Sequence, residues 1–140
     1  MIIILELLPH EDDEVMFAIA EELGLVFELI KDKTVFLPTL EVLCKHDETV
    51  VREQATISLS IICKYLSDAE IQNVFAPLVI KLAQCDWFPG RSSSCALFTA
   101  CYVKSGPQKE KLRKKFIELC NEDTPMIRRA CAKRLGEFSI

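Results

Sequence analysis

The sequence predicts an all-α protein, an α-solenoid of about four stacked pairs of antiparallel helices, and three observations support this fold class. First, four acidic residues each follow a leucine by four positions, namely Glu11, Asp47, Asp86 and Asp123. Successive members of this set are separated by 36, 39 and 37 residues. A period of this size is typical of repeated helix pairs. Second, apolar residues recur at helical spacing, without the alternation of strands. Third, four glycines and six prolines in 140 residues are too few for a chain of strands and turns.

Each period divides into a first helix, A, and a second helix, B. The A helices are predicted at about 1–8, 34–46, 68–85 and 108–121, and the B helices at about 13–30, 49–66, 90–105 and 125–140. Together they predict a single domain over residues 1–140, with repeats at about 1–32, 33–67, 68–106 and 107–140. We expect the first and last repeats to be incomplete. Uncovered ends of this kind, or the buried face of every helix, would explain the mean hydropathy of +0.20.

The first A helix begins with the apolar residues 1–5, a run that ends at Glu6 and has no basic flank. A run this short cannot span a bilayer and does not resemble a signal peptide. We therefore expect no membrane contact, and we interpret the run as half of an amphipathic helix in a chain that begins inside a repeat.

Signals at the boundaries of the later elements support their ranges. Asp47 and Asp123 precede the second and fourth B helices, where a short carboxylate can accept hydrogen bonds from free backbone N–H groups. Residues 67–70, Ser-Asp-Ala-Glu, have the spacing of a capping box at the start of the third A helix. The Ser-Gly-Pro sequence at 105–107 ends the third repeat. Pro125 occupies a first-turn position, where its missing N–H does no harm.

Alignment of the four B helices predicts which side chains pack in the core. One column holds Val15, Val51, Gly90 and Ile127, and a second holds Leu23, Leu59, Phe98 and Leu135. Two further columns hold small residues. The first of these is Ala20, Thr56, Cys95 and Ala132, and the other is Gly24, Ser60, Thr99 and Gly136. The small residues are expected to let neighbouring helices approach closely. A large residue at Ala132, or truncation of Leu59, is then expected to cost about 1–5 kcal/mol of stability.

The sequence carries no motif of an active site, a metal site or a cofactor site. The seven cysteines are odd in number and form no CxxC pair, so we interpret them as core residues in a reducing compartment, the cytoplasm and also the nucleus. His46 lies two residues after Cys44, and such positions on a helix point to different faces. A Cys-His nucleophilic pair formed across repeats stays open, although no motif supports it. We therefore predict that the chain is not an enzyme.

Nucleic-acid binding is also disfavoured. Residues 109–115 form a basic stretch on one A helix, with Lys109, Lys111, Arg113, Lys114 and Lys115. However, the net charge is −4 and no aromatic stacking platform accompanies the lysines. We interpret the stretch as a solvated outer face.

The B helices resemble those of HEAT repeats, which carry an Asp, then a β-branched residue and an Arg. The matching strings are residues 47–52, Asp-Glu-Thr-Val-Val-Arg, and 123–128, Asp-Thr-Pro-Met-Ile-Arg, while Asp86 and Arg91 keep the spacing. In HEAT proteins these residues form ladders between successive repeats. The resemblance therefore implies a structural ladder of Asp47, Arg52, Asp86, Arg91, Asp123 and Arg128. The first repeat departs from the pattern, with Met16 in the Arg position.

A narrower resemblance covers nearly the whole chain. Residues 48–52, 86–98, 123–130 and 135–138 are similar, in the same order, to the scaffold (A) subunits of protein phosphatase 2A. The resemblance implies the amino-terminal part of a non-catalytic scaffold whose A–B turns bind a regulatory (B-type) phosphatase subunit. The catalytic phosphatase subunit would be bound only through later repeats absent here. The alternative is a general HEAT-repeat adaptor, for example of the nuclear-transport type, and the Trp-Phe and Thr-Pro-Met turns argue against it.

The residues expected to contact the regulatory subunit lie in or next to the A–B turns. They are Asp47, Glu48, Trp87, Phe88, Pro125, Met126 and Arg129. Trp87 is interpreted as an exposed interface anchor, the alternative being that it packs on the next repeat's turn. Arg129 is expected to hold a partner carboxylate, unless it is only a solvated charge. The acidic turns, residues 11–14, 47–48 and 122–123, are expected to steer basic surfaces toward this ridge.

Overall fold

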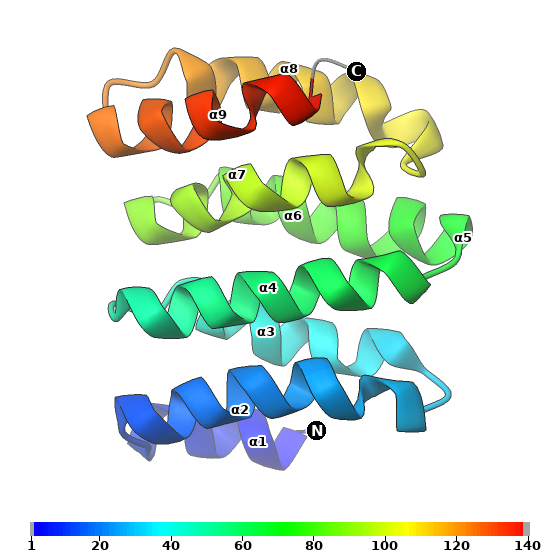
Figure 1. Ribbon diagram of the computed structural model, residues 1–140, viewed down its shortest axis with the longest axis vertical. Coiled ribbons are helices and arrows are strands. Elements are labelled where there is room, and N and C mark those ends of the chain that lie inside the picture. The colour runs from blue at the N-terminus through cyan, green and yellow to red at the C-terminus, as the bar shows by residue number, and fades with distance from the viewer. Residues whose placement is uncertain (1, 139–140) are drawn as a thin grey trace.

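The computed structural model of the protein describes residues 2–138, with side chains from Ile4 to Glu137. The described residues form helices and turns and contain no strand, so the predicted all-α solenoid is confirmed. The helices pair, and the pairs stack along the long axis of the molecule (Figure 1). None of the described helices is long and apolar enough to cross a membrane.

The A helices form one layer of the stack. This layer holds α1 (Ile2–Leu7), α3 (Leu37–Leu43), α6 (Ala76–Ala83) and α8 (Lys109–Cys120), with the short helical segments η1 (Leu8–His10), η3 (Lys33–Phe36), α5 (Asp68–Glu70), η4 (Ile71–Phe75) and η5 (Gly106–Gln108) at their ends. The B helices form the second layer, in front of the first in Figure 1. They are α2 (Asp13–Val26), extended by η2 (Phe27–Leu29), α4 (Thr49–Tyr65), α7 (Phe88–Tyr102) and α9 (Pro125–Phe138). The A–B turns therefore line a single edge of the stack, on the left in Figure 1.

The third A helix contains a π-helical segment. The predicted helix at 68–85 is observed as a run from Asp68 to Ala83, in which Ile71–Phe75 is π-helical and Ala76 donates its N–H to the carbonyl of Ile71. Pro77 follows directly. A proline has no N–H, and in a regular α-helix its ring would collide with the carbonyl four residues earlier. A wider turn before the proline relieves this conflict while keeping the helix continuous.

The expected capping signals are partly observed. The capping box is confirmed, because Ser67 Oγ accepts from the N–H of Glu70 and the Glu70 carboxylate accepts from the N–H of Ser67 at 2.8 Å. Pro125 is the first residue of α9, as predicted. The capping role expected for Asp47 and Asp123 is wrong, because α4 begins at Thr49 and α9 at Pro125. Both aspartates therefore lie one residue too early to cap the free N–H groups.

The aligned columns of the B helices agree with the core in most positions. Val51, Gly90, Ile127, Leu23, Leu59 and Phe98 are all buried. In the first pair the register differs, since Met16 is buried and Val15 is 38% exposed. Met16 stands where the later repeats have an arginine, and its apolar side chain turns inward instead. Leu135 and Ala132 are exposed, because among the described residues no helix packs on the outer side of α9. The expected cost of a large residue at Ala132 is therefore wrong.

Small residues bring α2 and α4 into close contact. A Cβ atom built on Gly24 would lie 2.4 Å from Ser58 Oγ, well inside the contact distance of a carbon and an oxygen atom. Ser58 Oγ in turn donates a hydrogen bond of 2.6 Å to the carbonyl of Ala20. The absence of a side chain at Gly24 thus sets how closely the first two B helices approach, and with it the spacing of their turns.

Candidate partner-binding surface

The turn edge places the predicted contact residues of three repeats in a row. Asp47 and Glu48 come from the turn before α4, Trp87 and Phe88 from the turn before α7, and Pro125 and Met126 from the start of α9. All but Phe88 are exposed, with Trp87 at 52% and Met126 at 59%. Trp87 and Met126 are large apolar side chains facing water at a position where the solenoid itself does not cover them.

Trp87 is tied to the preceding repeat. Its indole Nε1–H donates a hydrogen bond of 3.1 Å to Asp47 Oδ1, and its ring packs on Phe88 with centroids 5.3 Å apart. The observed hydrogen bond therefore runs back to the turn before it, whereas the alternative interpretation placed Trp87 on the next repeat's turn. Because one edge of the indole is held by Asp47 and one side by Phe88, the remaining surface is presented in a fixed orientation.

An arginine fastens each of the last three A–B turns. One guanidinium nitrogen of Arg91 donates to the main-chain carbonyls of Cys85 and Asp86, at 2.8 and 2.6 Å. Arg52 and Arg128 make the equivalent pairs of bonds to the carbonyls five and six residues before them. These carbonyls follow the ends of the A helices, where main-chain acceptors lack helical partners. The three arginines therefore hold their own turns in one conformation.

The observed contacts between repeats differ from the predicted Asp–Arg ladder. Arg91 is the one ladder arginine among the described residues whose side chain contacts a carboxylate, and that carboxylate is Glu122. The two groups form a bidentate pair with distances of 2.7 to 3.1 Å, and each side chain is only about a fifth exposed. The Asp47 carboxylate binds Trp87 instead of an arginine. The guanidinium groups of the arginines bind the carbonyls of their own turns. The one acidic side chain that reaches such a group among the described residues is Glu122, which is longer than an aspartate.

The Arg91–Glu122 pair shifts the acidity of both groups. Hydrogen bonding to Arg91 lowers the pKa of Glu122, and the same bonding raises the pKa of Arg91. A second ion contact between repeats lies in the A layer, where Glu41 of α3 binds Lys81 of α6 and Lys45, each at 2.7 Å. Burial raises the pKa of Glu41, but the two lysines outweigh this and the net pKa is lowered.

Arg128 and Arg129 serve different surfaces, as their adjacent places on a helix require. Arg128 faces its turn, whereas Arg129 is exposed and borders a groove across the B helices together with Met126. The predicted contact residues therefore do not form one surface. Those from Asp47 to Met126 lie along the turn edge, and Arg129 extends this edge onto the face of the B helices.

The acidic residues expected to steer a partner lie on the same edge. Glu11 to Glu14, Asp47, Glu48 and Asp123 are exposed, and among them Asp12 caps α2 by accepting from the N–H of Val15 at 3.0 Å. Part of this charge thus stabilises helix starts, and the rest faces solvent. Glu122 belongs to the Arg91 pair and adds no free charge to the edge.

The basic stretch of α8 is largely engaged in contacts within α8 and with Tyr102 of α7. Arg113 donates to the hydroxyl of Tyr102 at 2.8 Å and pairs with Glu110, Lys115 pairs with Glu118, and Lys109 lies over the ring of Tyr102. These contacts agree with the interpretation of a solvated outer face.

The cysteines are free thiols, and most are buried in the core. Cys95 of α7 and Cys131 of α9 lie with sulfur atoms 3.4 Å apart, and each is about 1% exposed. Burial raises the pKa of the Cys63 thiol to about 11. Thiols in such surroundings stay protonated and pack as small apolar groups. In the described part of the chain, no three His, Cys, Asp and Glu side chains are placed to hold a metal ion.

Comparison with known proteins gives one consistent result. The chain is 42% identical over 144 residues to the beta isoform of the human 65 kDa regulatory (A) subunit of serine/threonine-protein phosphatase 2A, a match that covers 96% of this chain. It is 39% identical to the protein phosphatase 2A scaffold subunit of Dictyostelium discoideum and 41% identical to the alpha isoform of the 65 kDa regulatory (A) subunit of Arabidopsis thaliana. The chain is homologous to the scaffold (A) subunits of protein phosphatase 2A.

The homology extends over only part of these relatives. The chain spans about a quarter of their length, between 23% and 25% in the three proteins above. No family model matches the sequence. The relatives are named as regulatory or scaffold subunits, and none of these names describes a catalytic subunit.

Proposed function

We propose that the chain is a non-catalytic scaffold module of the protein phosphatase 2A holoenzyme, and that its A–B turns bind a regulatory (B-type) subunit. The observation that carries this proposal is the half-exposed Trp87, held by Asp47 and Phe88 on an edge of aligned turns. A large aromatic side chain fixed before binding buries much area at low entropic cost. The homology to scaffold subunits supports the same role.

The solenoid supplies rigidity where the partner would bind and compliance along its length. Each of the last three turns is fastened by its own arginine, so the contact residues keep their relative positions within a repeat. Adjacent repeats contact mainly each other, so small changes of angle add up along the stack. The acidic residues of the edge would raise the rate at which a basic partner surface arrives.

The test is the affinity of a purified regulatory subunit for the Trp87→Ala variant. We expect a loss of about 2 kcal/mol or more, which corresponds to roughly a thirty-fold weaker Kd, with the melting temperature little changed. Tyr65→Ala is the matched control, because Tyr65 is 54% exposed at the opposite edge of the stack and should leave the affinity unchanged. Unchanged affinity of Trp87→Ala for every regulatory subunit would refute the proposal.

We further propose that the chain has no phosphatase activity and does not by itself bind the catalytic subunit, which would engage repeats outside this chain. Most of its thiols are buried, and burial raises the pKa of the Cys63 thiol, so these thiols are poor nucleophiles and this supports the first part. A pull-down with the purified catalytic subunit and no other partner tests the second part. Capture of that subunit by the 140 residues would contradict it. The free thiols support a place in a reducing compartment, the cytoplasm or nucleus.

A further inference from the structure

A groove crosses the face of the B helices beside the turn edge. It has a volume of about 610 Å³ and is bounded by α4 on one side and α9 on the other, with α7 as its floor. Ser92 and Ala96 of α7 line the floor, while Ile57 of α4 and Met126 of α9 stand on the two walls. Ile57 is 51% exposed and Met126 59%, so both present apolar surface to the groove and to solvent.

The groove exists because α7 differs from its neighbours. Arg91 is the only charged residue of α7, and its guanidinium is used by the turn and by Glu122. The outward positions of α7 hold small residues, whereas a surface helix usually carries charged ones there. The floor is therefore low and uncharged between two walls that carry long side chains.

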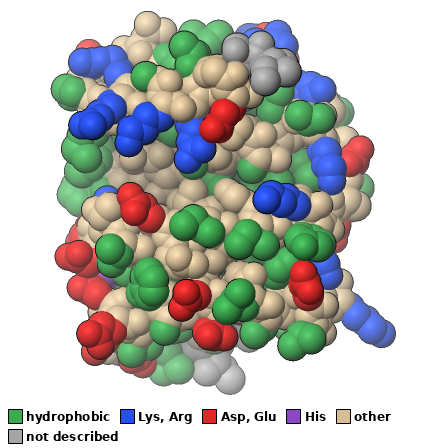
Figure 2. Space-filling view, in the orientation of Figure 1, with side chains coloured by type: hydrophobic (Ala, Val, Ile, Leu, Met, Phe, Trp, Pro, Cys, Tyr) green, Lys and Arg blue, Asp and Glu red, His purple; other side chains and the backbone are tan. Residues whose placement is uncertain are grey.

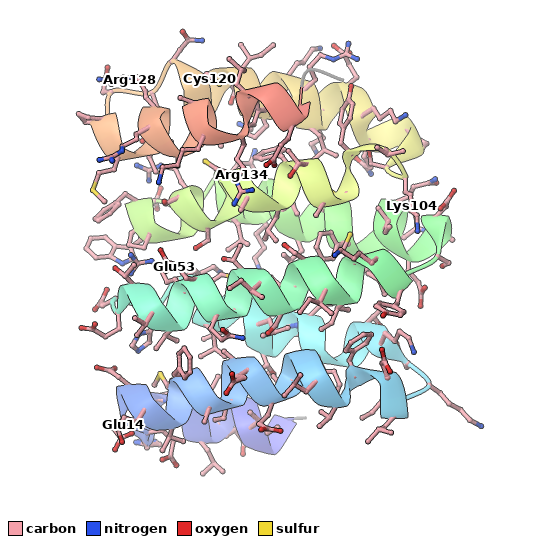
Figure 3. All side chains as sticks on the ribbon, in the orientation of Figure 1. Glu14, Glu53, Lys104, Cys120, Arg128 and Arg134 are labelled. Atoms are coloured by element: carbon pink, nitrogen blue, oxygen red, sulfur yellow. The ribbon has the colours of Figure 1, made fainter. Side chains whose placement is uncertain are left out.

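The wall formed by α9 is strongly basic. Arg129 and Lys133 are one helical turn apart on the same face, and among the residues that the structure describes neither forms an ion pair. Arg134 pairs with Glu137 at 3.2 Å and extends from α9 toward α7 (Figure 3). The opposite wall carries Glu53 of α4. Figure 2 shows the blue side chains gathered over α9 and the red ones over the lower part of the same face.

We propose that this groove binds an acidic amphipathic helix of a partner protein. Carboxylates four residues apart on that helix would meet Arg129 and Lys133, which have the same spacing. Its apolar stripe would lie over Ala96 and contact Ile57 and Met126 on the two walls. The site extends beyond the turn edge and binds without any contribution from Trp87.

The dimensions and charges of the groove favour a helix over other occupants. Packed helices lie about 8–10 Å apart, so α4 and α9 are separated by roughly twice that distance and a helix about 10 Å wide touches both walls. A nucleic acid would gain contacts on the α9 wall but would bring its phosphates toward Glu53.

The test measures binding of a fluorescein-labelled 18-residue helical peptide to the 140-residue chain by fluorescence anisotropy. The peptide carries Glu at positions i and i+4 along one face and Leu and Ala along the adjoining face. Its control has the same composition in a scrambled order. We expect the helical peptide to bind at least about ten-fold more tightly than the scrambled one at physiological salt, because only the ordered face meets both the cations and the apolar walls.

Variants separate the groove from general charge attraction. Lys133→Glu should weaken binding about ten-fold or more, whereas Lys111→Glu, the same charge change on the exposed face of α8, should leave it unchanged. Ala96→Trp should also weaken binding, because the indole would fill the space above the floor of the groove. If Ala96→Trp does not fold, Lys133→Glu still tests the proposal, because Lys133 is exposed and its substitution should not disturb the fold. Trp87→Ala should bind the peptide normally. Loss of regulatory-subunit binding at the turn edge can therefore be told apart from loss of peptide binding in the groove.

Three results would overturn the inference. One is equal binding of the helical and scrambled peptides. Another is an equal effect of Lys111→Glu and Lys133→Glu. The third is displacement of the peptide by a single-stranded oligonucleotide at lower concentration than by unlabelled peptide, because that would assign the basic wall to phosphate binding.

Discussion

The Arg91–Glu122 pair should be the strongest polar contact between two repeats of this chain. Removal of Glu122 by the substitution Glu122→Ala leaves the guanidinium with its two carbonyl acceptors but without a counter-ion. Removal of Arg91 leaves the carboxylate without its counter-ion and two main-chain carbonyls without their donor. We therefore expect Arg91→Ala to destabilise the chain more than Glu122→Ala does.

The magnitude follows from burial and geometry. Exposed ion pairs contribute about 0–1 kcal/mol, whereas breaking a fully buried pair costs about 3–5 kcal/mol. Both side chains here are about a fifth exposed and the pair is bidentate, which places its coupling at about 1–2 kcal/mol. Loss of the two carbonyl contacts adds about 1–2 kcal/mol to the effect of Arg91→Ala. The total of roughly 3 kcal/mol would lower the melting temperature by about 10 °C in a chain of this length.

The assay is a double-mutant cycle of Arg91→Ala and Glu122→Ala, followed by urea unfolding. The Arg134–Glu137 pair is the matched control, because its side chains are 41% and 54% exposed and its coupling should stay below about 0.5 kcal/mol. A coupling between Arg91 and Glu122 no larger than that of the control would refute the reasoning, since the pair would then add nothing to the contact between the third and fourth repeats.

Further predictions follow from the same contacts and can be measured by thermal or urea unfolding. Leu59→Ala should destabilise the chain by about 2–5 kcal/mol, because Leu59 is fully buried, whereas Ala132→Leu should cost less than about 0.5 kcal/mol because Ala132 is exposed. Gly24→Ala should cost about 1–3 kcal/mol by overpacking against Ser58, and a gain in stability would show that α2 and α4 separate freely. The folded-state pKa of Glu122 is lowered, so its contribution is complete above the unfolded pKa of about 4.3 and is lost as the pH falls through the folded value. Glu122→Gln should therefore lose less stability than the parent below about pH 4, and a parallel loss in both would contradict this.

The arrangement of helices could be predicted from the sequence because its signals are local. Apolar periodicity and the Ser67–Glu70 capping box act within one or two turns of a helix, so single-sequence reasoning reaches them. The π-helical segment before Pro77 was missed, although a proline inside a helical pattern signals such a distortion. The exposure of Val15 was missed because the alignment of B helices assumed one register, while Met16 replaces the turn arginine and is buried in its place.

The contacts between repeats could not be predicted because residue type alone does not identify the partner. The three arginines were predicted to bind aspartates between repeats, but their acceptors are mostly main-chain carbonyls of their own turns, which have no sequence signal. The link from Trp87 to Asp47 spans 40 residues and depends on how two turns align. Glu122 could have been considered from its place next to Asp123, since it has the longer side chain. The groove was missed because it requires three helices side by side, two of them with long side chains and one without.

The position of Asp47 links the geometry of the turn edge to the recognition role proposed for it. Since α4 begins two residues later, this carboxylate is not used as a helix cap and is free to accept from Trp87. Asp47→Asn would keep an acceptor oxygen for the indole while removing the charge, whereas Asp47→Ala would remove both. If orientation of the indole matters, Asp47→Ala should weaken regulatory-subunit binding and Asp47→Asn should largely preserve it. If the acidic charge matters instead, both variants should slow association alike and flatten its dependence on salt, so the pair of substitutions separates a held anchor from an electrostatic guide.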